Sequence, residues 1–226
     1  MSIVILCGMP SELKVLKRVF PGFTILSGAD KLSLHILIPG DCTRIVVSGL
    51  FGGLAPGIPV GSICMAETIS DQSGDVFECD AKWNDAVLGA GVKVGMRFGV
   101  VPWYSSGVLD QADSAVQRAD LFHKGFSAID DEARYAVAEA QRRKIPCNDF
   151  RSCSDDWTET LPLAATGAIM NKNGTANEDY LFRSIAEESI HDTLDLGQIA
   201  FDYAKSLHTF ETALNAVKFQ FVDGAT

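Results

Sequence analysis

The chain has 226 residues, of which 47% are hydrophobic and 21% are charged, and its formal net charge at pH 7 is -10. This composition predicts a globular protein with a sizeable buried core. The acidic balance excludes nucleic acid and an anionic membrane surface as the main partner, because no basic patch is available to neutralise phosphates. Neither a secretory signal nor an apolar stretch of membrane-spanning length is visible, so we expect a cytoplasmic protein without a transmembrane segment.

The six cysteines and four histidines are scattered along the chain. The cysteines form no CxxC pair, which favours free thiols in a reducing compartment over a disulfide framework. None of the histidines has a neighbour at the spacing of metal ligands, so we expect no metal site.

The first half of the chain consists of short β-prone runs separated by turns rich in glycine and proline. Residues 3–6 predict a buried strand, and the turn at 8–10 leads into a helix that Ser11 is placed to cap. Residues 49–57 contain four glycines and predict a loop. Further strand-like runs occur at 35–38, 44–47, around 63, at 76–77 and within 92–101.

The second half contains longer periodic segments. Residues 127–129 predict a short strand that leads into a helix over 131–144. Residues 147–153 predict the next strand. Residues 194–217 carry large apolar side chains at intervals of three and four, which is typical of a helix docked on a core.

This alternation of strands and helices favours a three-layer α/β fold, in which a mixed, twisted central sheet is flanked by helices. No internal repeat or convincing linker interrupts the chain. We therefore expect one domain over residues 1–226, with residues 176–220 forming a helical C-terminal segment packed on it.

Acidic side chains follow two of the predicted strands. Asp130, Asp131 and Glu132 lie at the start of a predicted helix, where carboxylates commonly cap free N–H groups. Asp155 follows the strand over 147–153, where an ordinary turn or cap would also place it. Taken alone, each cluster is better explained by structure than by catalysis. The glycine-rich segment matches neither the dinucleotide-binding nor the P-loop motif, and the chain has no G-x-S-x-G elbow.

The order of these pieces is more informative than any one of them. A strand ends in a Gly-Met turn with Glu12, a second strand enters the glycine-rich segment, and two acidic motifs follow, ending at Glu132 and Asp155. The series resembles the nucleoside phosphorylase superfamily, and especially the methylthioadenosine/adenosylhomocysteine nucleosidases. The resemblance runs over nearly the whole chain and implies a phosphorylase/hydrolase-like fold. Its most specific part is the pair of acidic motifs, separated by one helix and one strand.

The resemblance also implies roles for individual residues. Glu132 would grip the ribose hydroxyls, with Arg151 near the sugar. Asp155 would protonate the purine at N7, and Glu12 would orient the attacking water. No metal or organic cofactor is implied, and the family usually forms homodimers or larger assemblies. Further substrate contacts would come from Met9, Phe51, Gly52, Val108 and Asp131.

These residue types suit the cleavage of an N-glycosidic bond. A purine anion is a poor leaving group, and protonation by a positioned acid accelerates such a step by roughly 10²–10⁴-fold. The departing sugar becomes oxocarbenium-like, and carboxylates stabilise its positive charge. We therefore predict release of a purine base, adenine in the first instance, from a small-molecule nucleoside with a 5′ modification.

Water is the predicted nucleophile. Purine phosphorylases of this fold hold phosphate with arginines and a hydroxyl, whereas this chain has Glu12, Val47 and Leu50 at the matching places. A carboxylate repels a phosphate dianion, and neither Val nor Leu has a side chain that donates a hydrogen bond. Phosphorolysis stays open as an alternative, with Arg44 as the residue that would be recruited.

Two other hypotheses stay open. Segments at 161–165, 181–185 and 199–203 resemble the hopanoid-associated phosphorylases, which are implied to remove adenine from adenosylhopane. In that case residues 100–104 would face a hydrophobic 5′ group, although a buried hairpin or strand accounts more simply for their apolar and aromatic side chains.

The second hypothesis, a protein that binds a nucleoside without cleaving it, rests on departures from the family pattern. Asp131 replaces a methionine, and Asn148 and Asp149 interrupt an otherwise apolar strand, where burial requires polar partners.

Overall fold

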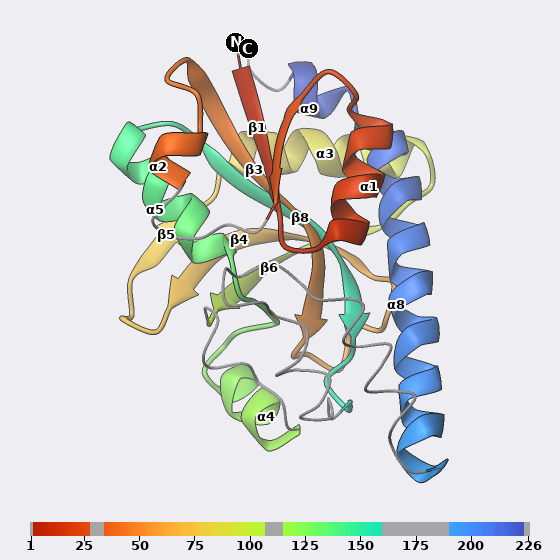
Figure 1. Ribbon diagram of the computed structural model, residues 1–226. Coiled ribbons are helices and arrows are strands. Elements are labelled where there is room, and N and C mark those ends of the chain that lie inside the picture. The colour runs from red at the N-terminus through yellow and green to blue at the C-terminus, as the bar shows by residue number, and fades with distance from the viewer. Residues whose placement is uncertain (1, 28–33, 107–114, 160–189, 224–226) are drawn as a thin grey trace.

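The computed structural model describes residues 2–27, 34–106, 115–159 and 190–223 (Figure 1). Within these ranges eight strands form one mixed sheet. The strands are β1 (Ser2–Cys7), β2 (Thr24–Ser27), β3 (Cys42–Gly53), β4 (Ile63–Asp71), β5 (Val76–Glu78), β6 (Phe98–Ser105), β7 (Ala128–Asp130) and β8 (Cys147–Asp155). The helices are α1 (Pro10–Val19), α2 (Leu34–Leu37), α3 (Ala81–Lys93), α4 (Ala115–His123), α5 (Ala133–Arg143), α8 (Ile190–Val217) and α9 (Gln220–Asp223).

The sheet closes on itself. Its strands follow the order β2-β1-β3-β7-β6-β4-β5, and β8 pairs with both β3 and β4. Because β8 bridges these two strands, β3, β7, β6, β4 and β8 form a closed ring. The pairing of β3 with β8 is parallel and runs from Ile45 opposite Cys147 to Gly52 opposite Asp155. Both strands therefore end at one edge of the sheet, on the side where α4 lies (Figure 1).

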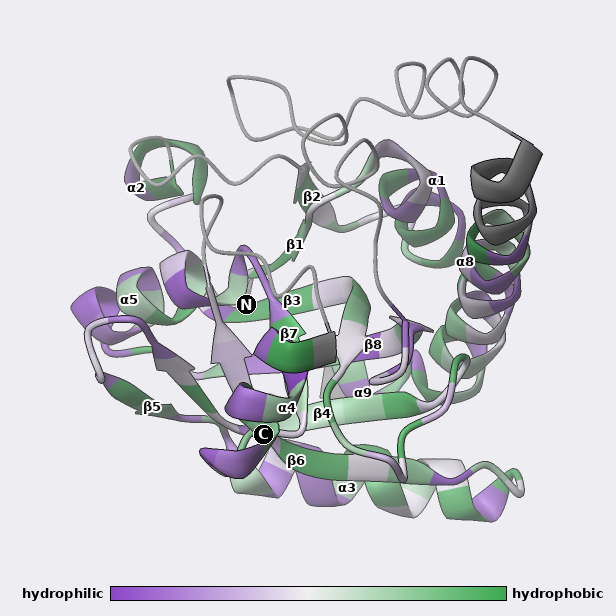
Figure 2. Cartoon of the chain, turned by 90° about the horizontal axis from the view of Figure 1, so that it is seen from below, coloured by the Kyte–Doolittle hydropathy of each residue, from purple (hydrophilic) through white to green (hydrophobic). Residues whose placement is uncertain are grey.

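Both faces of the sheet are covered by helices. On β1, Val4 and Leu6 belong to a core cluster that includes α5, whereas Ile3 and Ile5 belong to a second cluster that includes α1, α3 and α8. Strands buried on both faces need apolar side chains on both, and in Figure 2 β4 and β6 are mainly hydrophobic while the helices show both colours. The predicted three-layer arrangement with a mixed central sheet is confirmed.

Most predicted elements are present, and two assignments were wrong. Residues 35–38 were expected to form a strand, but they lie in and just after α2. Leu34 and Ile38, four residues apart, are the buried pair, and the Ile38 N–H donates to the Leu34 carbonyl at 2.9 Å. Residues 49–53 were expected in a loop, but they continue β3, because β8 pairs with residues 49–52 and β7 pairs with Gly53.

Two local predictions also need correction. Ser11 does not cap α1: Met9 is the cap residue, and its N–H donates to Glu12 in the first turn. The β-prone run over 92–101 is divided, since Val92 still belongs to α3, which ends at Lys93, and β6 begins only at Phe98. Helix α3 itself was missed, although Asp80 just before it accepts hydrogen bonds from the backbone in the manner of an N-cap.

Buried polar side chains at the beginning of β3 and β8 bind one another. Arg44 Nη1 donates to Asn148 Oδ1 at 2.5 Å, and Arg44 Nη2 donates to Asp80 Oδ2 at 2.8 Å. Asn148 Nδ2 in turn donates to Asn84 Oδ1 at 3.2 Å, so Asn148 has the partners that its burial requires. Arg44 lies at the opposite end of β3 from Gly52 and is bound to Asn148 and Asp80, so its position does not support the alternative in which it is recruited to bind phosphate.

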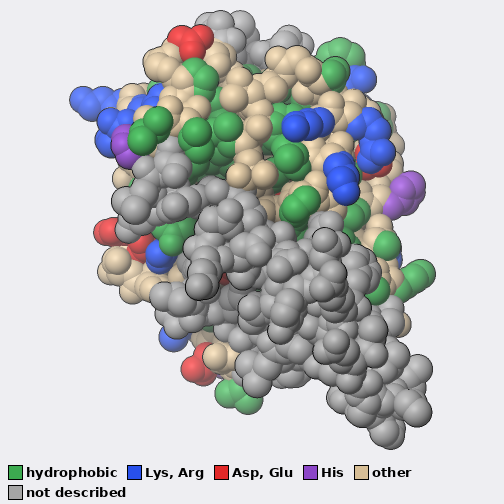
Figure 3. Space-filling model, in the orientation of Figure 1, with side chains coloured by type: hydrophobic (Ala, Val, Ile, Leu, Met, Phe, Trp, Pro, Cys, Tyr) green, Lys and Arg blue, Asp and Glu red, His purple; other side chains and the backbone are tan. Residues whose placement is uncertain are grey.

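The surface and the thiols agree with the composition. All six cysteines are free and buried. On the face shown in Figure 3, the described Lys and Arg side chains form separate groups rather than one continuous patch. Among the described helices, none is both long and apolar enough to cross a bilayer.

Glu139 provides a test of how α5 is attached to α2. Its carboxylate accepts from Arg142 Nε at 2.8 Å and from Arg143 Nε at 2.5 Å, and Arg143 also donates to the carbonyl of Pro39 at 2.8 Å and that of Ile38 at 3.0 Å. The hydrogen bond from Arg142, followed by that from Arg143, lowers the pKa of Glu139 from 4.5 to about 2 against the opposing effect of burial.

We expect Glu139→Gln to lower the free energy of unfolding at pH 7. The difference from wild type should shrink as the pH falls from about 4.5 towards 2, because a carboxylate with a lowered pKa stabilises the folded state only while it is ionised. Urea unfolding at a series of pH values measures this, with exposed Glu78→Gln as the control. A difference that does not change with pH would contradict the role of the charge.

Candidate active site

Glu12 is held by the backbone at the beginning of α1. Its Oε2 accepts from the N–H groups of Gly8 at 2.9 Å and Met9 at 2.8 Å, and its Oε1 accepts from the N–H of Leu50 at 2.7 Å. The residue is only 2% exposed. Three backbone donors from two segments therefore fix the orientation of one buried carboxylate.

Two glycines allow this close approach. A Cβ atom on Gly49 would lie 2.6 Å from the carboxyl carbon of Glu12, so β3 can pass the carboxylate only without a side chain here. A Cβ atom on Gly8 would lie 2.9 Å from Oε1 of Glu132. The turn at Gly8 thus lies between the carboxylates of Glu12 and Glu132 and is in close contact with both.

The surroundings raise the proton affinity of both carboxylates. Burial, and then the negative charge of Glu132, raises the pKa of Glu12 from 4.5 to about 7, although Arg151 and the backbone donors oppose the shift. Burial likewise raises the pKa of Glu132, against the effect of Arg151. A carboxyl group whose pKa lies near 7 can exchange a proton at neutral pH.

Arg151 joins this site to the interior. Its Nη1 donates to Oε1 of Glu132 at 2.8 Å and to the carbonyl of Leu50 at 3.0 Å. Its Nη2 lies 3.0 Å from Oδ2 of Asp130, and its Nε donates to Oδ1 of Asp149 at 2.9 Å. The structure therefore brings the predicted pair of Glu132 and Arg151 together. Arg151 contacts three carboxylates, those of Glu132, Asp130 and Asp149.

Asp130 and Asp131, which precede Glu132 in the acidic motif, bind groups close to them in the structure. Asp130 Oδ1 accepts from the N–H of Ala133 at 3.1 Å and from the Ser105 hydroxyl at 2.5 Å. Asp130 thus takes the capping role expected for a carboxylate at the start of a helix. Asp131, beside Glu132, accepts from the Ser106 hydroxyl at 2.8 Å.

Asp155 lies further along the same edge. Its Oδ1 accepts from the Ser154 hydroxyl at 2.5 Å, and its Oδ2 forms an ion pair with Nη2 of Arg118. A Cβ atom on Gly52, the residue opposite it in β3, would lie 3.1 Å from Oδ2. A side chain on Gly52 would therefore force this carboxylate or Ile129, 3.0 Å from the same Cβ position, to shift slightly.

Arg118 was missed by the sequence analysis. It comes from α4 and is 2% exposed, and its Nη1 donates to the carbonyls of Gly53 at 3.1 Å and Asp156 at 3.0 Å. No motif surrounds Arg118, so only the fold reveals its contact with Asp155. Glu159 was also missed: burial, and then Asp155, raises its pKa to about 7.

The remaining predicted contacts have different outcomes. Met9 lies beside α8, where the Tyr203 hydroxyl contacts its Sδ at 3.1 Å. Phe51 is 2% exposed and packs on Trp103, with 4.7 Å between ring centroids, so its side chain belongs to the core rather than to an accessible ligand surface. Val108 lies outside the described residues.

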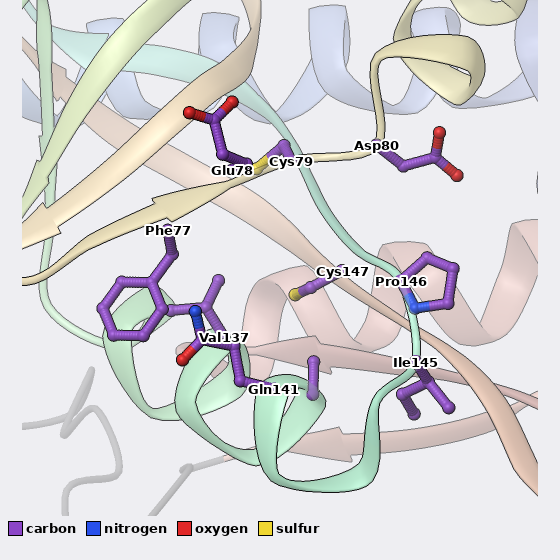
Figure 4. Close-up of a pocket in the computed structure, with 10 residues that line it drawn as sticks. Phe77, Glu78, Cys79, Asp80, Val137, Gln141, Ile145, Pro146 and Cys147 are labelled. Carbon is purple, nitrogen blue, oxygen red and sulfur yellow. The ribbon is translucent and has the colours of Figure 1, made fainter.

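A separate cavity of about 210 Å³ lies between β5, α5 and the beginning of β8 (Figure 4). It is at the opposite end of β8 from Asp155, and neither Glu12, Glu132 nor Arg151 lines it. Within the described ranges no three His, Cys, Asp or Glu side chains are grouped to hold a metal ion. The candidate site is therefore the cluster of carboxylates and arginines at the shared edge of β3 and β8.

The chain matches no family model, and no curated protein matches its sequence. Solved structures do match over its whole length. A 5′-methylthioadenosine/S-adenosylhomocysteine nucleosidase from Helicobacter pylori aligns with a TM-score of 0.68 at 14% identity, covering 97% of this chain and 98% of that one. The corresponding nucleosidase from Neisseria meningitidis aligns with a TM-score of 0.64 at 12% identity, covering 99% of each chain.

These matches define the class of fold, which is the one shared by the solved methylthioadenosine/adenosylhomocysteine nucleosidases. A second enzyme of this fold, the futalosine hydrolase of Helicobacter pylori, aligns with a TM-score of 0.67 at 14% identity, covering 97% of this chain and 98% of that one. The fold inferred from the acidic motifs is confirmed.

The contact between Gly49 and Glu12 can be tested by adding one methyl group. We expect Gly49→Ala to lower the free energy of unfolding by about 1–3 kcal/mol, because the new Cβ atom would collide with the buried carboxylate. Gly57→Ala is the matched control, since a Cβ atom there meets nothing within 4 Å. Denaturant unfolding measures both variants, and equal stability of the two would contradict the close packing.

Proposed function

We propose that the chain is an enzyme that hydrolyses the N-glycosidic bond of a purine nucleoside with a 5′ modification. The observation that carries the proposal is the Glu12 carboxylate, buried beside Glu132 and held by three backbone N–H groups. A carboxylate in this position is oriented to accept a hydrogen bond from a water molecule and to take its proton. No metal or organic cofactor enters the proposal.

The spacing of the acids supports a nucleoside as the substrate. Gly49 of β3 is opposite Arg151, and Gly52 is opposite Asp155. Three residues of strand separate the two positions by roughly 10 Å, at about 3.3 Å per residue. The ribose hydroxyls would bind Glu132, and the base would extend towards Asp155. The two ends of one nucleoside can therefore engage both acidic motifs.

Asp155 is proposed to protonate N7 of the base as the glycosidic bond breaks. Ser154 and Arg118 hold its two oxygens, so the carboxyl group has a fixed direction. Glu12 and Glu132, both near the sugar, would stabilise the positive charge that develops there. The three acids thus have separate tasks at separate places.

The local charges favour water over phosphate as the nucleophile. The Leu50 N–H, which could otherwise donate to a phosphate oxygen, already donates to Glu12. Arg151 is held among carboxylates, and Arg44 lies at the other end of β3. A phosphate dianion in this site would face Glu12 and Glu132 and be repelled.

The proposal also covers the 5′ group of the substrate, the base, the oligomeric state and the cellular location. The matched nucleosidases are named for 5′-methylthioadenosine and S-adenosylhomocysteine. Met9, at the turn beside Glu12, offers an apolar and adaptable surface for such a group. Adenine as the base, a homodimeric assembly and a cytoplasmic location stay predictions.

Chromatographic detection of free base tests the reaction. We expect release of base from methylthioadenosine in buffer without phosphate, and a loss of roughly 10²–10⁴-fold in rate for Asp155→Asn, which removes the proton donor. Asp156→Asn is the matched control, because that side chain binds only Thr158 among the contacts described. Release only in the presence of phosphate would contradict hydrolysis. Binding without any release would favour the non-catalytic alternative.

The pH dependence of the rate tests Glu12. Because Glu12 must be ionised to accept a proton and its pKa is raised to about 7, kcat/KM should rise as the pH increases through about 7. Glu12→Gln should be much slower and should lack this rise. Stopped assays between pH 5 and 9 measure both proteins. A wild-type rate that is flat across this range, or full activity of Glu12→Gln, would remove the role of Glu12.

A further inference from the structure

Asp149 is an unusual residue for its position. It is fully buried in β8, a strand that is inaccessible along nearly its whole length. Its neighbour on the same face, Cys147, lines the apolar cavity of Figure 4. An apolar side chain would avoid the cost of burying a carboxyl group at such a place.

The only polar contact described for Asp149 is with Arg151. Oδ1 accepts from Nε of Arg151 at 2.9 Å, whereas Oδ2 has no hydrogen-bond partner within the described structure. Asp149 therefore cannot be explained as a cap, a turn or a link between strands. Its contribution must act through the guanidinium group.

That guanidinium group is held on each of its nitrogen atoms by a different carboxylate. Nε contacts Asp149, Nη1 contacts Glu132, and Nη2 contacts Asp130. The group is planar, so a partner on Nε limits the directions in which Nη1 and Nη2 can point. The contact on Nη1 faces the site, and the contact on Nε comes from the interior.

We propose that Asp149 is a positioning residue that orients Arg151, and through it Glu132, for binding of the ribose hydroxyls. The inference rests on the proposed function, because it assigns the sugar to Glu132. This role also explains why a carboxylate interrupts an apolar strand. A valine or leucine would leave Nε unpaired and would remove one of the contacts that orient the guanidinium group towards Glu132. Asp149 itself touches neither sugar nor base.

Calorimetric titration with two probes separates this role from a general loss of stability. Methylthioadenosine has a ribose and adenine has none, so a defect in the ribose clamp should weaken binding of the first probe alone. All variants are made in the Asp155→Asn background, so that the nucleoside survives the titration. Three changes are compared: Asp149→Leu, Asp149→Asn and, as the control, Ser152→Ala. The control removes another buried polar group from β8, and the Ser152 hydroxyl has no hydrogen bond to Arg151.

We expect Asp149→Leu to raise the dissociation constant of methylthioadenosine by on the order of tenfold or more, because a charged hydrogen bond is lost, and to leave that of adenine within about twofold. Asp149→Asn should recover most of the affinity, because its carbonyl oxygen can still accept from Nε. Ser152→Ala should leave both constants unchanged.

Equal weakening of both probes, or unchanged binding of methylthioadenosine by Asp149→Leu, would overturn the inference while leaving the proposed reaction intact. Failure of the background protein to bind methylthioadenosine at all, together with no release of base by the wild type, would overturn the proposed function and this inference with it. The wild type and the Asp155→Asn background both retain Asp149, so their results test the proposed function separately from the role of Asp149.

Discussion

The site depends on one buried cation. Arg151 is 1% exposed, and a guanidinium group in the interior is tolerated only when its donors are paired. Its partners come from the Leu50 carbonyl in β3, from Asp130 and Glu132 around the end of β7, and from Asp149 in β8. Removing the arginine would leave several carboxylates buried close together without a counter-charge. The same contacts that join these strands therefore also determine where Glu132 lies.

A second constraint is the use of backbone rather than side chains to hold Glu12. Backbone donors cannot move away from a carboxylate as a side chain can, and they require the chain to approach it closely. Gly49 and Gly8 meet this need, since a Cβ atom on either would strike a carboxylate. The glycine-rich segment is thus part of a strand that passes the site. Its Leu50 N–H already donates to Glu12, which supports the proposal that water is the nucleophile.

The similarity to solved nucleosidases extends over the whole chain although only 12–14% of residues are identical. A fold can host different reactions, so the fold alone does not determine the substrate. In this chain a charged group supports each acidic motif: Arg118 pairs with Asp155, and Asp149 contacts Arg151, which binds Glu132. The sequence motifs do not predict either contact, and both bear on how the two acidic motifs are held.

The sequence by itself determined the three-layer class, most of the strands and helices, and the acids at the two strand ends, Glu132 and Asp155. These features follow from apolar periodicity and short motifs, which are properties of neighbouring residues. Only the tertiary structure decided that residues 49–53 form a strand, that Arg44 is remote from the site, and that Arg118 reaches a carboxylate 37 positions away. The reason is physical: strand pairing, burial and the pairing of charges depend on groups that are distant in the chain and meet only when it folds.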